Sequence, residues 1–143
     1  MGAWGTGPFD NDEAMNLFAE LEHLKEPDRV LERARRVLDA AAGRPGYLEV
    51  DEGNQAVAAA LLVAAGATPT SSGSPQVDDW LSSFVTGHSG CTVEDQALAL
   101  RALERVHGPY SEWSELWARN EHYPAIRAWS EQLRQALETP RTG

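Results

Sequence analysis

The chain has 143 residues, of which 42% are hydrophobic and 24% are charged, and its formal net charge is −10. This length and composition are typical of one globular domain with its own core and exclude a disordered chain. The longest apolar run, 56–65, is too short to span a bilayer, and Cys91 is the only cysteine, so membrane-spanning and disulfide-framed proteins are excluded. No leader pattern of basic and apolar residues opens the chain, and we expect a cytoplasmic protein.

Helical spacing of apolar residues predicts two helices in the first third of the chain. Asp10, with Glu13 three residues later, is typical of a helix cap, and apolar residues recur on one face over 14–24. Pro27 is favoured in the first turn of the second helix, which we expect to end before Gly43.

The middle third predicts a central helix, a loop and a shorter helix. Asp51 is the expected cap of the third helix. Residues 56–65 are apolar on all sides, which is typical of a helix packed against several neighbours. The composition of 66–76 (GATPTSSGSPQ) predicts a flexible loop, and Ser74 before a proline is expected to begin the fourth helix.

Three further helices are predicted in the last third. Thr92 is expected to open the fifth helix, which ends at Gly108; Ser111 opens the sixth, and Pro124 begins the seventh. The sixth helix is expected to carry three apolar side chains on one side: Trp113, Leu116 and Trp117. These aromatic residues, with Tyr110, Tyr123 and Trp129, are interpreted either as core or as an exposed patch that anchors a partner.

The sequence as a whole predicts an all-α fold. No segment shows the sustained alternation of β-branched residues that indicates a strand. We expect a compact single-domain helical bundle of about six or seven helices over residues 1–143. A Gly-rich segment, 1–10, is expected to be ordered and packed on the bundle.

Charge is unevenly distributed along the chain. Residues 45–100 contain seven acidic side chains and no Lys or Arg, whereas 1–44 contain nine acidic and six basic residues and 101–143 contain six of each. An acidic middle third repels phosphate backbones and anionic lipids. Nucleic acid and membrane surfaces are therefore disfavoured as partners.

The first twelve residues, MGAWGTGPFDND, match a family pattern. The pattern is Met-Gly-x-Trp-Gly-x-Gly-x-Phe-x-Asn-Asp, and the matching residues are Gly2, Trp4, Gly5, Gly7, Phe9, Asn11 and Asp12. In this stretch the chain resembles a bacterial family of small proteins catalogued as domain of unknown function 4259. The resemblance implies a small bacterial helical protein and supplies no activity.

Two interpretations of this N-terminal motif remain open. In the first, Trp4 and Phe9 are buried against the helices, because ordering several glycines costs conformational entropy that burial of large aromatic side chains offsets. In the second, the motif is a ligand- or partner-binding loop that uses Trp4, Asp10, Asn11 and Asp12.

No catalytic residues, metal site or cofactor motif are predicted. Two Glu-x-x-His pairs have the local spacing of a di-iron bundle but lie off the predicted apolar faces: Glu20/His23 and Glu104/His107. His88 and Cys91 lack a second pair of ligands for zinc.

These observations favour a non-enzymatic interaction module whose partner is another protein, for example in an immunity- or antitoxin-like role. The absence of a catalytic pattern and the acidic middle third carry this hypothesis. The alternative is a small enzyme, or a ligand- or metal-binding protein, with its site at the Gly-rich N-terminal motif.

Overall fold

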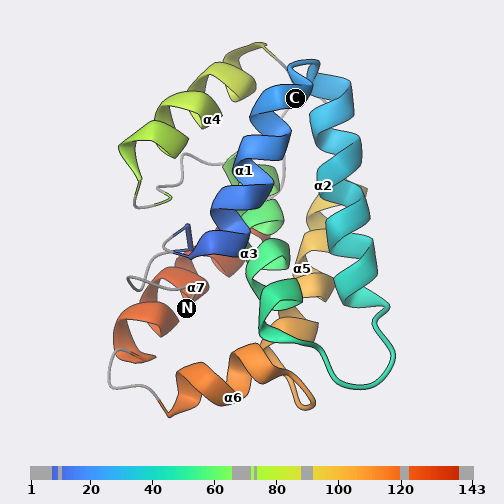
Figure 1. Cartoon of the computed structure of the whole chain (residues 1–143), viewed down its shortest axis with the longest axis vertical. Coiled ribbons are helices and arrows are strands. Elements are labelled where there is room, and N and C mark those ends of the chain that lie inside the picture. The colour runs from blue at the N-terminus through green and yellow to red at the C-terminus, as the bar shows by residue number, and fades with distance from the viewer. Residues whose placement is uncertain are drawn as a thin grey trace.

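The computed structural model describes residues 8–9, 11–65, 72, 74–87, 92–119 and 123–138, without the side chains of 85–87. These residues form seven α-helices (Figure 1): α1 (Asp12–Leu24), α2 (Pro27–Ala42), α3 (Val50–Ala65), α4 (Pro75–Gly87), α5 (Val93–His107), α6 (Glu112–Ala118) and α7 (Tyr123–Glu138). Within these ranges there is no strand, and Leu48 and Ser111 form an isolated parallel bridge. The all-α prediction is confirmed.

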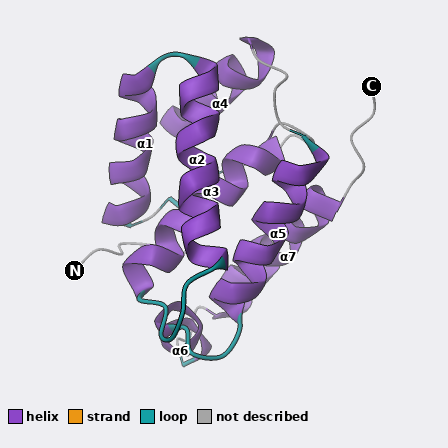
Figure 2. Cartoon of the chain, turned by 90° about the vertical axis from the view of Figure 1, so that its right-hand side faces the viewer, coloured by secondary structure: helices purple, strands orange, loops and turns teal. Residues whose placement is uncertain are grey.

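Helix α3 is the centre of the fold. It contacts each of the other six helices, and Figures 1 and 2 show it surrounded by them. Every residue from Ala56 to Ala65 is buried, with none more than 9% exposed. The prediction from the run of apolar residues, a helix packed on several sides, is therefore confirmed.

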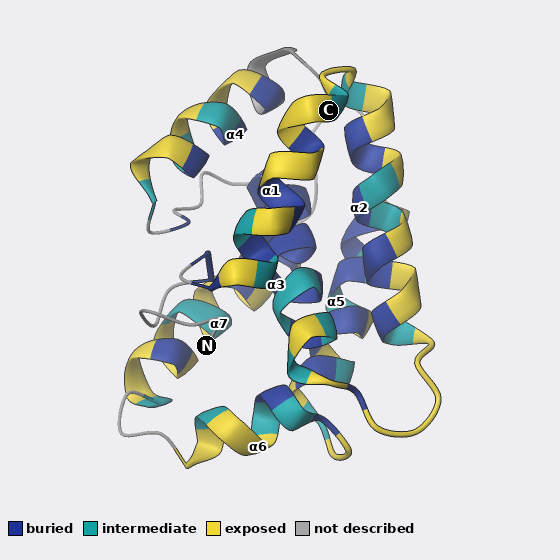
Figure 3. Cartoon of the chain, in the orientation of Figure 1, coloured by how far each residue is buried: buried dark blue, intermediate teal, exposed yellow. Residues whose placement is uncertain are grey.

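The remaining helices cover α3 from all sides. α2 and α5 pack against α3 and against each other, α1 lies beside α2, and α7 contacts both α3 and α5. Buried apolar side chains from all seven helices belong to one hydrophobic core. Figure 3 shows that the buried residues lie on the inward sides of the helices and the exposed residues on the outward sides.

The start of α1 differs from the expected cap. Asn11 is the N-cap, and its Oδ1 accepts a hydrogen bond from the backbone N–H of Ala14 at 2.8 Å. Asp10, the predicted cap, lies outside the described residues. With Asn11 as the N-cap, Ala14 and not Glu13 stands at the capping-box position, and the carboxylate of Glu13 accepts a hydrogen bond from Nε2 of Gln55 on α3 at 3.1 Å.

Other helix starts were predicted with mixed success. Thr92 and Asp95 form a complete capping box at α5, and Ser111 caps α6 through the N–H of Ser114, as expected for these residue types. The prediction for Asp51 was wrong by two positions, since α3 begins at Val50 and Asp51 lies in its first turn.

The expected loop 66–76 ends in an ordered turn where it is described. Ser72 is fully buried, and its N–H and its hydroxyl both donate to Oδ1 of Asp78, at 2.8 and 2.7 Å. Pro75 and Gln76 form the first turn of α4. Residues 66–71 and 73 lie outside the described residues, so their flexibility stays a prediction.

Aromatic side chains dock α4 onto α1. The rings of Trp80 and Phe18 meet edge to face with centroids 5.6 Å apart, and Trp80 stacks on Phe84 at the same distance. Phe9 extends this cluster, because its ring meets that of Phe18 at 6.4 Å. Offset and edge-to-face pairs of this kind add to the stabilisation that area burial gives.

Helix α6 buries one aromatic residue and exposes a leucine. Trp113 is 2% exposed, and its indole N–H donates to Oδ1 of Asn54 on α3 at 3.0 Å. Leu116, which was predicted on the same side of the helix as Trp113, is 52% exposed. None of the described helices is both long enough and apolar enough to cross a membrane.

Candidate functional site

The N-terminal motif is described only from its second half. Phe9 is 5% exposed and belongs to the core, as predicted. Trp4 lies outside the described residues, as does Asp10, so their roles stay predictions. Asp12 is exposed in the first turn of α1, where its negative charge is favourable.

Asn11 has a structural role in the described part of the motif. The residue is 7% exposed, and both ends of its amide are used: Oδ1 caps α1, and Nδ2 donates to the carbonyl of Pro8 at 3.4 Å. An amide that satisfies the helix start in this way is not available to a ligand.

Exposed aromatic side chains, an exposed and a half-buried glutamate and an exposed leucine gather at the α6 end of the molecule. We define this acidic-aromatic surface by five residues: Tyr47, Tyr110, Glu112, Glu115 and Leu116. The hydroxyl of Tyr47 donates to Oε2 of Glu115 at 2.8 Å, and the N–H of Leu48 donates to the carbonyl of Tyr110 at 2.8 Å. Tyr47, Tyr110 and Leu116 are 44%, 74% and 52% exposed.

Tyr110 is held in a conformation that residues other than glycine rarely adopt. Its φ angle is +59°, in the left-handed region, which costs about 1–2 kcal/mol for an L-residue. The carbonyl of Tyr110 is fixed from two sides, by the N–H of Leu48 and by the guanidinium of Arg105 at 3.3 Å. The strained turn therefore presents the tyrosine ring to solvent instead of packing it.

Arg105 binds together the two loops that carry this surface. Its guanidinium donates to the carbonyls of Arg44 and Gly46 in one loop and to those of Pro109 and Tyr110 in the other. One cation thus satisfies four backbone acceptors from segments about 60 residues apart in the sequence. The surface is preorganised by these bonds rather than left as two independent loops.

Carboxylates surround the Tyr47 hydroxyl in the acidic-aromatic surface. The hydrogen bond to Glu115 is the main reason that the pKa of Tyr47 is raised to about 12, and partial burial and the charges of Glu115 and Glu112 add to it. Glu49 and Asp51 are exposed at the adjacent start of α3.

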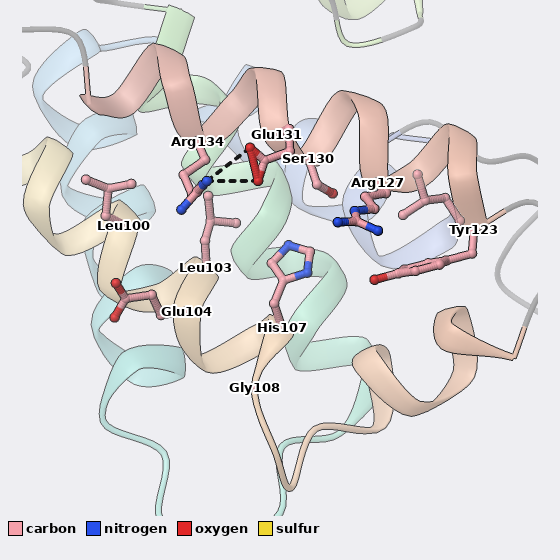
Figure 4. Close-up of a pocket in the computed structure, with 11 residues that line it drawn as sticks. Leu100, Leu103, Glu104, His107, Gly108, Tyr123, Arg127, Ser130, Glu131 and Arg134 are labelled. Carbon is pink, nitrogen blue, oxygen red and sulfur yellow. Dashed lines mark hydrogen bonds and ion pairs between the residues drawn. The ribbon is translucent and has the colours of Figure 1, made fainter.

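A separate cavity lies between α5 and α7 (Figure 4). Its volume is about 380 Å³, and its lining includes the apolar side chains of Leu100, Leu103 and Ile126. The polar side chains of His107 and Ser130 line it from opposite helices.

His107 connects this cavity with α6. Its ring meets the indole of Trp113 edge to face, with centroids 4.8 Å apart. Burial lowers the pKa of His107 below its ordinary value of 6.5; the charge of Glu131 opposes this shift and that of Arg134 adds to it. The imidazole is therefore neutral at neutral pH and can both donate and accept a hydrogen bond.

Two of these residues had no signal in the sequence: Tyr47 and Arg105. Tyr110 was noted as part of an aromatic-rich region, but its exposure depends on contacts with the distant loop that contains Gly46. A repeat of polar residues on one face of the last helix, at Tyr123, Arg127 and Ser130, was the signal that could have indicated the cavity. No three of the His, Cys, Asp and Glu side chains in the described ranges form a group that could hold a metal ion.

The described residues form an all-α bundle around a central apolar helix, α3. The chain belongs to the family described as Domain of unknown function (DUF4259), whose model matches residues 2–132. The family resemblance noted from the first twelve residues is thereby confirmed. No curated protein and no solved structure matches the chain.

Proposed function

We propose that this protein is a non-enzymatic interaction module that binds a basic protein through the acidic-aromatic surface. Tyrosine is one of the residues that most often contribute strongly to binding at protein interfaces. Here two tyrosines and a leucine are exposed beside two carboxylates, Glu112 and Glu115. Such a surface combines apolar contact area with a charge that attracts a cationic partner.

The conformation of Tyr110 is the observation that carries this proposal. Strained backbone persists only where the surrounding structure enforces it, and it is concentrated at functional positions. In this protein the enforcing bonds come from Arg105 and Leu48, which hold the backbone carbonyl of Tyr110, and the residue is 74% exposed. A tyrosine whose backbone is already ordered loses less conformational entropy when a partner binds.

The charge of the whole protein supports a basic partner. The formal net charge of −10 accelerates encounter with a cationic protein and slows encounter with nucleic acid. An immunity- or antitoxin-like role, in which the protein covers a basic toxin, belongs to this proposal. A bacterial source and a cytoplasmic location are expected for such a role.

The test is affinity capture from a lysate of the source organism at low and at high salt. The wild type is compared with the double variant Tyr110→Asn/Leu116→Ser; asparagine is chosen because it tolerates the left-handed region. Val93→Ser, which alters an exposed apolar residue on α5 at 64% exposure, is the matched control.

We expect the wild type and the control to retain the same basic protein in stoichiometric amounts at low salt and to release it at high salt. The double variant is expected to retain little of it. If no stoichiometric basic protein is retained at low salt, or if the double variant retains it as well as the control does, the proposal is wrong.

The alternative, a ligand or catalytic site at the Gly-rich N-terminal motif, stays a prediction for Trp4 and Asp10. In the described part of the motif, Asn11 caps a helix and Phe9 packs in the core. These two roles favour the structural interpretation, and we propose no chemistry for the motif.

A further inference from the structure

The cavity between α5 and α7 has the size and composition of a small-molecule site. Ligand pockets generally have volumes of roughly 300–1,000 Å³ and combine apolar walls with a few polar groups. This cavity measures about 380 Å³, and Leu100, Leu103 and Ile126 provide apolar wall from both helices. A compact molecule with an apolar body therefore fits it.

Ser130 is the polar group whose bonding is incomplete. Its Oγ is buried and has no hydrogen-bond partner among the described residues. A buried hydroxyl without a partner is unfavourable, and such groups are rare in folded proteins. Ser130 also lines the cavity, so a polar atom of a ligand can complete its bonding once the atoms that cover the Oγ shift.

Arg127 lies one helical turn from Ser130. No described residue forms an ion pair with its positive charge. Residues three apart on a helix lie on the same face, so Arg127 and Ser130 both border the cavity, as Figure 4 shows. No hydrogen bond or ion pair joins Arg127 to another residue in the described part of the chain. In Figure 4 its guanidinium, the phenol of Tyr123 and the imidazole of His107 point into the space between the helices.

The other cation that lines the cavity is already paired. Nη2 of Arg134 donates to both carboxylate oxygens of Glu131, at 2.9 and 3.0 Å, and Nη1 lies 3.9 Å from Oε1 of Glu138. Glu104 contributes a further negative charge near Arg134. The positive charge left for a ligand is that of Arg127.

We propose that this cavity binds a small organic monocarboxylate, with the carboxylate at Arg127 and Ser130 and an aliphatic or aromatic body against Leu103 and Ile126. A guanidinium and a hydroxyl side by side match the two oxygens of a carboxylate. This site is independent of the acidic-aromatic surface and of any protein bound there.

The charges around the cavity exclude two other ligand classes. A dianion such as phosphate is repelled more strongly than a monoanion by Glu104 and by the net charge of −10 of the chain, and it has no apolar body for Leu103 and Ile126. A cation is repelled by Arg127, and the carboxylate of Glu131 already binds Arg134. The ligand class that remains is a molecule with a single negative charge and an apolar body.

The test is a titration of the full chain with benzoate, followed by ¹H–¹⁵N NMR. Benzamide, which has the same ring without the charge, and inorganic phosphate, which has charge without the ring, are titrated in parallel. For benzoate we expect saturable chemical-shift changes at the amides of 100–108 and 123–134. For the other two probes we expect dissociation constants that are larger by about tenfold or more.

Two variants and one control assign the binding to the proposed groups. Arg127→Gln is expected to weaken benzoate binding about tenfold, because a charge-assisted hydrogen bond is lost. Arg101→Gln, which alters an exposed arginine of α5 outside the cavity, is expected to bind like the wild type. Ser130→Ala is expected to weaken binding severalfold without lowering the melting temperature of the unliganded protein, because the hydroxyl it removes has no partner.

The inference is overturned if benzoate causes no saturable shifts near the cavity, if benzamide or phosphate binds as tightly, or if Arg127→Gln binds benzoate like the wild type. A loss of melting temperature in Ser130→Ala would contradict the role given to its hydroxyl.

Discussion

Asp95 shows how the fold accommodates a buried charge. Its side chain is 6% exposed, and its carboxylate accepts hydrogen bonds from Nε and Nη2 of Arg35, at 2.6 and 2.8 Å, and from the N–H of Thr92 at 2.8 Å. Burial would raise the pKa of Asp95, but the hydrogen bonds from Arg35 and Thr92 and the charge of Arg35 outweigh it and hold the pKa below its ordinary 3.8. The ion pair fastens α2 to the start of α5.

Replacing Asp95 by alanine should therefore destabilise the protein by about 2–4 kcal/mol, because it removes half of a capping box and leaves Arg35 without its bidentate partner. Glu94→Ala, at an exposed position in the same first turn, is the matched control and should cost about 0.5 kcal/mol. Urea unfolding of both variants measures the difference. Equal losses in the two variants would contradict this account of Asp95.

The sequence predicts only the local half of this arrangement. Thr92 followed by Asp95 is a capping pattern within four residues, and it was recognised as a helix start. Arg35 is 60 positions from Asp95, and no local pattern indicates which of the many arginines reaches it. The same limit applies to Asn11, since Asp10 beside it is an equally good cap by residue type.

At the scale of elements, the approach of α6 to α3 depends on a glycine. A Cβ atom at Gly53 would lie 2.9 Å from Cβ of Trp113 and 3.1 Å from its ring. This glycine was not singled out in the sequence, because a glycine inside a helix has no local signature of close packing. The burial of Trp113 depends on it.

Gly53→Ala is expected to destabilise the protein by about 1–3 kcal/mol, although alanine has the better helix propensity by about 1 kcal/mol. The added methyl group must displace Trp113, which is held by its hydrogen bond to Asn54 and by its ring contacts. Gly43→Ala is the control, because its new Cβ would meet its nearest neighbour at 3.4 Å, in ordinary contact. Thermal unfolding should separate the two variants; a Gly53→Ala variant as stable as Gly43→Ala would contradict the packing argument.

Helices were easier to predict from sequence than the surfaces they expose. The apolar run of α3 indicated its central position without any knowledge of its neighbours, because no side of it could face water. In α6 the spacing of the apolar residues did not indicate which of them is buried: Trp113 is buried and Leu116 is exposed, since a seven-residue helix at the end of the bundle buries only a narrow stripe. Exposure there is decided by tertiary contacts, not by spacing.

At the scale of the whole molecule, two titratable groups make the free energy of unfolding depend on pH. The pKa of His107 is lowered by burial and that of Asp95 by its ion pair, so the unfolded chain binds more protons than the folded one at both positions. The free energy of unfolding therefore falls as pH drops below 6.5 for His107 and below 3.8 for Asp95.

The melting temperature should accordingly decline between about pH 7 and pH 5, before the carboxylates titrate. His107→Asn should flatten this decline, whereas His23→Asn, on α1 and outside the cavity that His107 lines, should not. Calorimetry over this range measures the slopes. An unchanged slope in His107→Asn would show that another group causes the decline.

The candidate site could be predicted only in its chemical character. The acidic middle third disfavoured nucleic acid and membrane surfaces and left another protein as the expected partner, and the aromatic C-terminal region left open an exposed patch. Tyr47 and Tyr110 become neighbours through the Leu48–Tyr110 hydrogen bond and the bridging guanidinium of Arg105, which join distant parts of the chain. The place of the surface is therefore a property of the fold.

Photocrosslinking from position 110 in cells of the source organism tests the central claim most directly. A photoreactive phenylalanine analogue replaces Tyr110 in one variant and Val93, on α5 but outside the surface, in another. The account predicts that the variant at 110 forms a covalent adduct with one basic protein, that high salt in the lysate suppresses it, and that the variant at 93 forms none. No adduct from position 110, or the same adduct from both positions, would contradict it.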